Sequence, residues 1–286
     1  MDLFFDLLRS VIYGVIEGIT EWLPISSTGH MILAEQVLKF SFSAEFMEMF
    51  RVVIQLGAIL AVVVMYFKKL WPFCVDNGRD SGLAKHVRWP VMRLWFKIIV
   101  ACLPAAVLGL ALDDWIDAHF YNSVVVAVML IVYGIAFILI ERRPRVPTTT
   151  KLSRITYRQA LLVGAWQVLA LIPGTSRSGS TIIGGLLCGM SRACASQFTF
   201  FLAIPVMAGA SGLKLVKFLV GGGVFTVAEI GALLVGCIVA FVVSIMAIRF
   251  LMDYVKKHTF TIFGWYRIAL GILVLGIWAL QSFVLA

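Results

Sequence analysis

Two acidic residues, a group of hydroxyls and a histidine lie close together near the N-terminus, in residues 17–30 (EGITEWLPISSTGH). Glu17 and Glu21 are four residues apart, so a helix places both carboxylates on one face. Such a pair can bind a divalent cation, act as a general base or attract a cationic partner, or it can be two interfacial charges at a helix end. Because carboxylate oxygens prefer hard cations, a metal held by Glu17 and Glu21 is expected to be Mg²⁺ or Ca²⁺.

Ser27 and His30 supply a candidate nucleophile and a candidate general base. They are separated by about one helical turn, so we expect the imidazole to reach the Ser27 hydroxyl or a water molecule. In the alternative mechanism water attacks, and Ser27 only orients the substrate. A lone histidine can also be an ordinary packed residue, but its neighbours here favour a role in proton transfer.

A second stretch, residues 167–181 (QVLALIPGTSRSGST), repeats part of this pattern when Gly14 is aligned with Gly164. The alignment pairs Glu17 with Gln167, Ser26 with Ser176, Thr28 with Ser178 and Gly29 with Gly179. Two polar, glycine-bearing loops at corresponding places in two halves of a membrane protein indicate a binding site near the bilayer midplane.

Each polar loop leads into a short helix, whose free N–H groups and positive dipole end favour a bound anion. Arg177 adds a planar charged group suited to phosphate, although it can also be a cytoplasmic anchoring charge. Gln55, an amide inside the next apolar run, is a further candidate because buried amides need partners. The other candidate substrate-binding residues are Ser26, Thr28, Gly29, Gly174, Thr175, Ser176, Ser178, Gly179 and Thr181.

The composition indicates an integral membrane protein. Of the 286 residues, 61% are hydrophobic and 14% are charged, and the mean hydropathy is +0.99, which is too apolar for a water-soluble domain of this size. Runs of about 20 apolar residues are long enough to cross a bilayer as helices and lack the alternation of a β-barrel. The net charge of +9 gathers in a few loops, which argues against a nucleic-acid partner. Acidic residues near the N-terminus argue against a cleaved signal peptide.

Two proline breaks divide the chain into two similar halves. Pro24 ends a helix over residues 3–23, and the helix that follows, to about Phe40, is too short to span a bilayer. We interpret this pair as a re-entrant hairpin, and Pro173 breaks a second helix in the same way. The expected spans are residues 46–67, 94–112, 122–140, 197–219, 227–250 and 262–285.

We therefore predict an all-α integral membrane protein with six spans and ten helices. Each half contains one re-entrant pair and three transmembrane helices, and because three is odd, the second half is inverted relative to the first. Residues 1–145 form the first repeat and residues 151–286 the second, within one membrane domain over residues 1–286. Basic residues place loop 68–93 and linker 141–158 in the cytoplasm, so both chain ends and the first re-entrant pair face outside.

At its two polar stretches the sequence resembles the undecaprenyl-diphosphate phosphatase family of the bacitracin-resistance type. The similarity rests on residues 17–30, on PGTSRSGST at 173–181 and on FRVVIQLGAILAVVV at 50–64, and it extends over almost the whole chain. It implies a hydrolase of a diphosphate anhydride, which converts undecaprenyl diphosphate to undecaprenyl phosphate and inorganic phosphate. This reaction recycles the lipid carrier for peptidoglycan synthesis, and so for cell-wall biogenesis and cell shape, and confers bacitracin resistance.

The resemblance also implies roles for individual residues and a location. Catalysis, metal binding and phosphate binding fall to Glu17, Glu21, Ser27, His30 and Arg177. The location is the bacterial plasma membrane, and the loop charges described above place the site on the external, periplasmic side. Two positions depart from the family pattern: Trp22 replaces a more usual phenylalanine, and Arg51 stands where an acidic residue is common.

A second function stays open at this point, because inverted repeats with broken helices are also a transporter architecture. A flippase could carry a polyprenyl-phosphate lipid across the membrane without hydrolysing it. The expected partners are a polyprenyl diphosphate lipid and the bilayer itself, and a homo-oligomer is compatible with the sequence.

Overall fold

The computed structural model describes residues 2–75, 78, 85–143 and 146–284. Met1, part of the predicted loop 68–93, the repeat boundary at residue 145 and the last residues of the final predicted span lie outside this description. Secondary structure in the described residues is helical, apart from isolated bridges between Phe73 and Val87 and between Thr149 and Met190. The predicted all-α class is confirmed.

The α-helices that position the site are, in chain order, α1 (Asp2–Thr20), α2 (Ser27–Val37), α3 (Ala44–Val53), α4 (Gln55–Met65), α5 (Phe67–Leu70), α6 (Trp89–Phe120), α7 (Ser123–Arg142), α8 (Tyr157–Val168), α9 (Arg177–Leu187), α10 (Arg192–Val220), α11 (Val227–Lys257) and α12 (Thr261–Val284). Within the described ranges, six helical segments are long and apolar enough to cross a membrane. They are Ala44–Met65, Trp89–Leu112, Ser123–Arg142, Arg192–Val220, Val227–Lys257 and Thr261–Ser282. The protein is therefore a multi-pass membrane protein, as predicted.

The predicted count of ten helices is too low because the first span is divided. At Ile54 the backbone makes a tight turn, in which the N–H of Gly57 donates to the Ile54 carbonyl at 3.1 Å. This hydrogen bond spans three residues instead of the four of an α-helix. It interrupts the α-helical hydrogen-bond pattern and separates α3 from α4. A further short helix, α5, follows α4 directly. Neither feature changes the apolar pattern from which the span was predicted.

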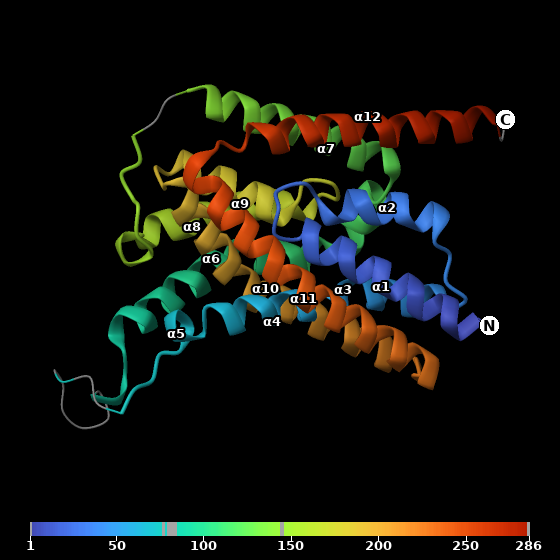
Figure 1. Ribbon diagram of the computed structural model, residues 1–286, viewed down its shortest axis with the longest axis horizontal. Coiled ribbons are helices and arrows are strands. Elements are labelled where there is room, and N and C mark those ends of the chain that lie inside the picture. Colours follow the sequence, from blue (N-terminus) through green and yellow to red (C-terminus); the bar gives the residue numbers. More distant parts are fainter. Residues whose placement is uncertain (1, 76–77, 79–84, 144–145, 285–286) are drawn as a thin grey trace.

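The two broken helices enter the molecule from opposite ends (Figure 1). From the N-terminus α1 runs to the middle of the molecule, and α2 returns to the same end. From the opposite end α8 runs to the middle, and α9 returns. Both chain ends lie at one end, which we call the terminal end. The other, which carries the segment between α7 and α8, we call the linker end. The breaks after α1 and after α8 thus meet in the interior.

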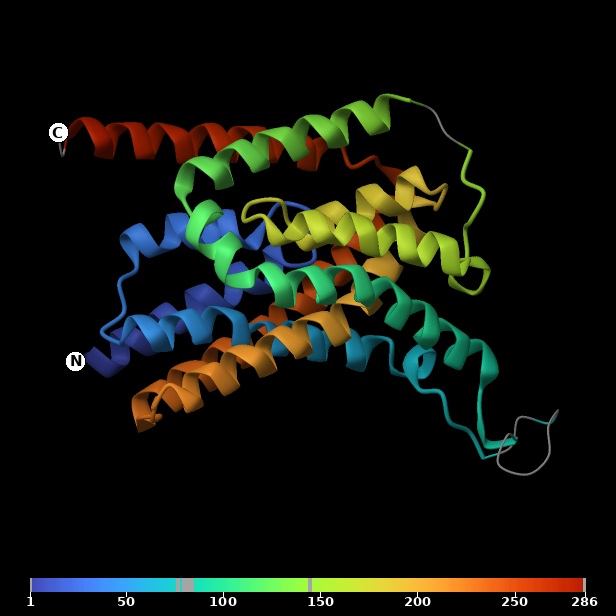
Figure 2. The ribbon, with the colours of Figure 1, turned by 180° about the vertical axis from the view of Figure 1, so that it is seen from behind.

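Close crossings of helices hold both breaks in place. Helix α1 packs on α11 and helix α8 on α6, while α7 lies along α12 (Figure 2). A Cβ on Gly14 would come within 2.7 Å of the Gly236 carbonyl oxygen, and a Cβ on Gly164 within 2.2 Å of the Ala101 carbonyl oxygen. The two glycines aligned by sequence therefore both lie where a neighbouring helix touches the backbone.

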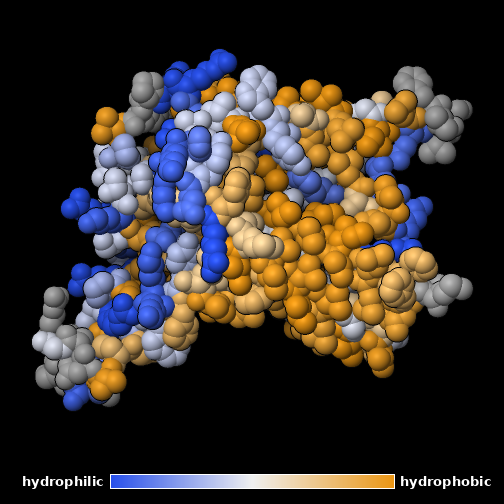
Figure 3. Space-filling view, viewed as in Figure 1, coloured by the Kyte–Doolittle hydropathy of each residue, from blue (hydrophilic) through white to orange (hydrophobic). Residues whose placement is uncertain are grey.

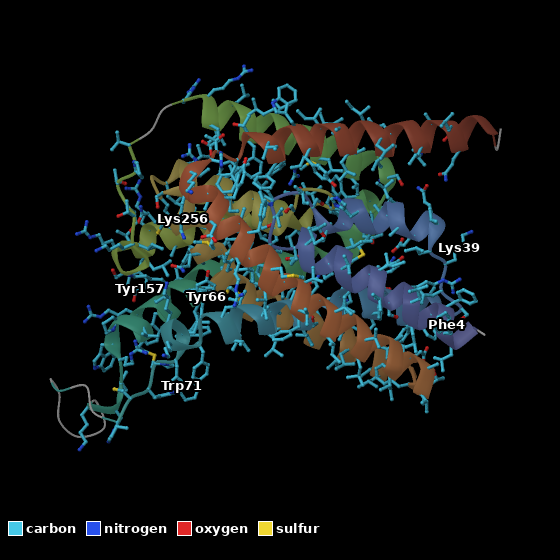
Figure 4. The ribbon with its side chains drawn as sticks, in the orientation of Figure 1. Phe4, Lys39, Tyr66, Trp71, Tyr157 and Lys256 are labelled. Carbon is cyan, nitrogen blue, oxygen red and sulfur yellow. The ribbon has the colours of Figure 1, made fainter. Side chains whose placement is uncertain are left out.

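The surface matches a bilayer environment. Apolar side chains cover the middle of the molecule, and hydrophilic side chains gather towards its ends (Figure 3). On α11 three outward-facing side chains are at least half exposed: Ile238 at 61%, Val242 at 50% and Met246 at 58%. Aromatic residues mark the ends: Phe4 lies at the terminal end and Trp71 and Tyr157 at the linker end (Figure 4). Such exposed apolar rows with aromatic borders suit contact with lipid.

Candidate active site

The two polar loops have the same unusual backbone conformation. Ser26 has φ 73° and Ser176 has φ 71°, the two positive-φ residues other than glycine in the described chain. The Ser26 hydroxyl accepts from the N–H of Gly29 at 3.4 Å, and the Ser176 hydroxyl accepts from the N–H of Gly179 at 3.1 Å. Each serine therefore caps a helix that starts at the site, and L-residues adopt this conformation only when their surroundings enforce it.

Side chains of the second loop bind the first loop directly. The guanidinium of Arg177 donates from Nε and Nη2 to Glu21 Oε1, at 3.2 and 2.9 Å, and from Nη1 to the Thr199 carbonyl at 3.2 Å. The Ser178 hydroxyl donates to the Leu23 carbonyl at 3.3 Å. Both side chains of the Arg177–Glu21 ion pair are largely buried, with 11% and 8% exposed. The structure thus brings residues 156 positions apart into one cluster.

Ser27 extends this cluster, because its hydroxyl donates to Glu21 Oε2 at 3.1 Å. One carboxylate therefore lies between the candidate nucleophile and the candidate phosphate-binding arginine. Glu17, one turn earlier on α1, is 1% exposed, and its Oε1 atom is buried without a hydrogen-bond partner. A buried carboxylate oxygen without a partner is costly, and a bound cation would satisfy it.

The expected contact between Ser27 and His30 does not form. His30 Nδ1 lies 2.7 Å from the Ser26 carbonyl oxygen, and Nε2 lies 2.8 Å from the Tyr266 hydroxyl on α12, whose ring stacks on the imidazole. The imidazole turns towards α12, whereas the Ser27 hydroxyl turns towards Glu21, so the one-turn spacing did not give a shared direction. The base in contact with Ser27 is Glu21.

These contacts define the protonation of His30. A carbonyl oxygen can only accept, so Nδ1 carries the hydrogen, and in the neutral ring Nε2 accepts from the Tyr266 hydroxyl. His30 lies outside the six membrane-spanning helices, and burial lowers the pKa of its imidazole below the ordinary value. The ring is therefore a neutral acceptor over a wider pH range than a solvated histidine.

Arg267 on α12 was not predicted from the sequence, although it is fully buried beneath both loops. Its guanidinium donates to the carbonyls of Pro24, Gly174 and Thr175, at 3.2, 3.0 and 2.8 Å. It therefore ties the first loop to the second through their backbones. An arginine inside an apolar span is the signal that could have identified it.

The remaining predicted residues lie in or beside this cluster. Gly174 has φ +89° and touches the backbone of Val126, a conformation and a closeness that favour glycine. Thr181 bonds to Thr199 at 2.9 Å, and the Ser176 and Ser178 hydroxyls are 3.2 Å apart. The hydroxyl of Thr175 is buried without a hydrogen-bond partner. These residues shape the second loop and do not line the pocket described next.

The cluster opens into a pocket of about 470 Å³ that is lined mostly by polar side chains. Its lining residues are Glu17, Ser27, Thr28, Met31, Glu48, Arg51, Val52, Gln55, Tyr121 and Lys214. Thr28 and Gln55, both predicted to bind substrate, thus face the same space as Ser27. Arg177 lies behind this wall, against Glu21. The pocket has the size of a small-molecule site.

The metal-ligating potential of the site is limited to the two carboxylates. In the part of the chain that the structure describes, three or more His, Cys, Asp or Glu side chains do not gather in a metal-binding group. The unpartnered Glu17 oxygen beside Glu21 still fits a cation, because Mg²⁺ is commonly held by one or two carboxylates together with substrate phosphates.

Comparison with known proteins agrees with this geometry. The profile of the family described as "Bacitracin resistance protein BacA" matches residues 10–273. An Enterococcus faecalis protein named "Undecaprenyl-diphosphatase" is 59% identical over 278 residues, covering 96% of this chain and 99% of its own. A Lactococcus lactis protein of the same name is 57% identical, covering 94% of this chain and 96% of its own. The chain belongs to the bacitracin resistance protein BacA family.

Proposed function

We propose that this protein hydrolyses undecaprenyl diphosphate to undecaprenyl phosphate and inorganic phosphate. The observation that carries the proposal is the continuous Arg177–Glu21–Ser27 cluster, which joins both loops and opens into a polar pocket. It combines a nucleophile, a proton acceptor and a guanidinium group suited to binding phosphate. The names of the relatives, nearly equal in length to this chain, support the same substrate. The product returns the lipid carrier to cell-wall synthesis, and the activity confers bacitracin resistance.

In the proposed reaction the Ser27 hydroxyl attacks the terminal phosphorus, and its proton passes to Glu21 Oε2, which already accepts from it. The anhydride P–O bond breaks, and undecaprenyl phosphate leaves with the bonding electron pair. Arg177 and the N-terminal ends of α2 and α9 stabilise the negative charge that develops. Water then hydrolyses the phosphoserine and restores Ser27. In the alternative route water attacks directly, and Ser27 orients the phosphate.

His30 and the carboxylate pair have supporting roles in this proposal. We assign to His30 proton transfer at the start of α2, where its neutral ring faces Tyr266. Glu17 and Glu21 are proposed to hold Mg²⁺ or Ca²⁺, supported by the unpartnered Glu17 oxygen. When bound, this cation would neutralise charge on the phosphate oxygens. The backbones and hydroxyls of the two loops orient the phosphate.

We also propose that the chain is an inverted-topology repeat within one membrane domain, with residues 1–145 and 151–286 as its halves. The matching caps at Ser26 and Ser176 and the matching helix crossings at Gly14 and Gly164 support it. With the basic linker end in the cytoplasm, the chain ends and the pocket mouth face outside. Nucleic acid is not an expected partner, and a homo-oligomer remains compatible with this arrangement.

The test is phosphate release from undecaprenyl diphosphate by purified protein, with Mg²⁺, with Ca²⁺ and with chelator. We expect cation-dependent release and a loss of at least about a hundredfold in Arg177→Ala, as for removal of one charge-stabilising donor. Arg192→Ala is the matched control, because it also removes an arginine that pairs with a buried carboxylate, that of Glu141. This pair lies outside both loops and lines a different pocket, beside Pro147 and Lys256. The control variant should retain activity per folded molecule.

The same assay separates the open alternatives. Full activity in Ser27→Ala would exclude the phosphoserine route and leave direct attack by water. Phosphate release that persists in the presence of chelator would exclude a required divalent cation from the mechanism. No release from folded wild type, combined with transport of the lipid across liposomes, would replace the enzyme by a flippase.

A further inference from the structure

The pocket beside Ser27 contains two cations that the reaction above does not use. Arg51 comes from α3, on which Glu48 lies one turn earlier, and Gln55 at the start of α4 lines the same pocket. Lys214 comes from α10. Both cations therefore face the same space as the Ser27 hydroxyl, and neither belongs to the two polar loops.

Each of these cations is held by a carboxylate that is more exposed than the cation itself. Arg51 pairs with Glu35, with exposed fractions of 23% and 33% for the two side chains. Lys214 pairs with Glu48 at 2.5 Å, with 19% and 57% exposed. The Lys214–Glu48 pair has an exposed carboxylate and contributes little to stability, and the half-buried Glu35 still has a third of its side chain in contact with solvent, so an incoming anion can take the place of either carboxylate. The carboxylates can then turn into water while the cations stay in the pocket.

The charge of a diphosphate requires more cations than the loops provide. Arg177 is already paired with Glu21, and Arg267 binds backbone carbonyls beneath the loops. Together with a divalent cation, Glu17, Glu21 and Arg177 would carry a net charge of only about +1, because three positive charges face two carboxylates. A diphosphate placed at Ser27 therefore leaves one phosphate group without a compensating charge in a partly dry pocket, which is unfavourable.

We propose that Arg51 and Lys214 form a second phosphate-binding subsite in this pocket. It rests on the proposed function and deepens it: the loops hold the phosphate that reacts with Ser27, and the Arg51–Lys214 subsite binds the other phosphate of the lipid headgroup or the inorganic phosphate that is released. The guanidinium of Arg51 binds two phosphate oxygens, and the ammonium of Lys214 adds a point charge. The polar lining suits the headgroup rather than the apolar tail.

The first test compares the two members of one ion pair. Arg51→Gln should raise KM for undecaprenyl diphosphate about tenfold while kcat changes less than about twofold, because a charge-assisted contact to bound substrate is lost. Glu35→Gln removes the competing carboxylate and should leave KM unchanged or lower it. A merely structural ion pair predicts equal losses in both variants, and that result would overturn the subsite. Arg51→Lys should recover part of the lost affinity.

The second test identifies which phosphate is bound. Lys214→Gln and Arg51→Gln are compared for KM and for inhibition by inorganic phosphate, beside Arg9→Gln as a control cation that pairs with Asp6 outside the pocket. A raised KM with unchanged phosphate inhibition assigns the subsite to the lipid headgroup. Weakened phosphate inhibition assigns it to the product. If both quantities match Arg9→Gln while the wild type is active, the subsite is wrong and the proposed function stands.

Discussion

At the scale of single residues, the site depends on polar groups whose partners come from distant parts of the chain. Glu21 accepts hydrogen bonds from Ser27 of its own loop and from Arg177 of the other loop. His30 is hydrogen-bonded to Tyr266 of α12. Glu21 is largely withdrawn from water whereas Tyr266 is exposed, but in both pairs the hydrogen bond favours one protonation state of its partner. Changing a partner should therefore alter the pH dependence of the reaction as well as its rate.

Tyr266→Phe tests this coupling. The Tyr266 hydroxyl donates to Nε2 and so stabilises the neutral form of His30, and its removal should raise the pKa of the imidazole. A reaction that needs neutral His30 loses activity when the pH falls below this pKa. With a raised pKa, the loss therefore begins at a higher pH. The acidic limb of the kcat/KM profile should move up by roughly half to one pH unit, the equivalent of one hydrogen bond. Tyr254→Phe, on α11, is the matched control. An acidic limb that does not shift in Tyr266→Phe would mean that His30 takes no part in the rate-determining proton transfer.

The sequence identified which residues gather at the site better than it identified their contacts. Glu21, Ser27 and Arg177 do meet, because two helix breaks with matching polar residues must meet to bury them. The direction of a side chain after a positive-φ serine cannot be read from spacing, so His30 was paired with the wrong partner. Arg267 was missed because the apolar residues around it satisfy the pattern of a span.

At the scale of helices, glycines at crossings determine how closely the broken helices approach their neighbours. The aligned pair, Gly14 and Gly164, shows that a repeat found by sequence can correspond to the same packing in space. The division of α3 from α4 at Ile54 illustrates the opposite case. A single tight turn leaves the apolar run intact, so the sequence predicted one continuous helix.

Gly164→Ala tests the crossing of α8 on α6. The added Cβ would lie 2.2 Å from the Ala101 carbonyl oxygen, so the helices must separate, and we expect a loss of about 1–3 kcal/mol from overpacking. Gly212→Ala in α10 is the control, because no atom lies within 4 Å of its Cβ position and alanine is the better helix former. Thermal unfolding in detergent should show a lower Tm for the first variant only, and equal values would mean that the crossing is not tight.

At the scale of the whole molecule, the distribution of charge predicts how the bundle lies in the bilayer. Basic residues gather at the linker end, and the polar pocket is lined by residues such as Glu48 and Tyr121 from helix ends nearer the chain ends. The predicted orientation, with the linker end in the cytoplasm, would place substrate entry on the external face.

Single cysteines in a background without the five native ones test this orientation. Lys39→Cys and Gly222→Cys, at the terminal end, should react with a membrane-impermeant thiol reagent in intact cells. Thr150→Cys, at the linker end, should react only after the membrane is opened. The reverse pattern would place the pocket mouth in the cytoplasm.

The buried guanidinium of Arg267 also bears on how far the two proposed halves, residues 1–145 and 151–286, can move against each other. An alternating-access carrier exposes its cargo first to one side and then to the other by rocking one half against the other. Here such rocking would have to break the bond from Arg267 to the Pro24 carbonyl, together with the Arg177–Glu21 pair and the hydrogen bond from Ser178 to the Leu23 carbonyl. Each rupture strands a buried polar group at a cost of about 1–3 kcal/mol, and more for the charged ones. The contact between the two proposed halves is therefore expected to stay rigid. The lipid headgroup would then diffuse to a site that does not move across the membrane.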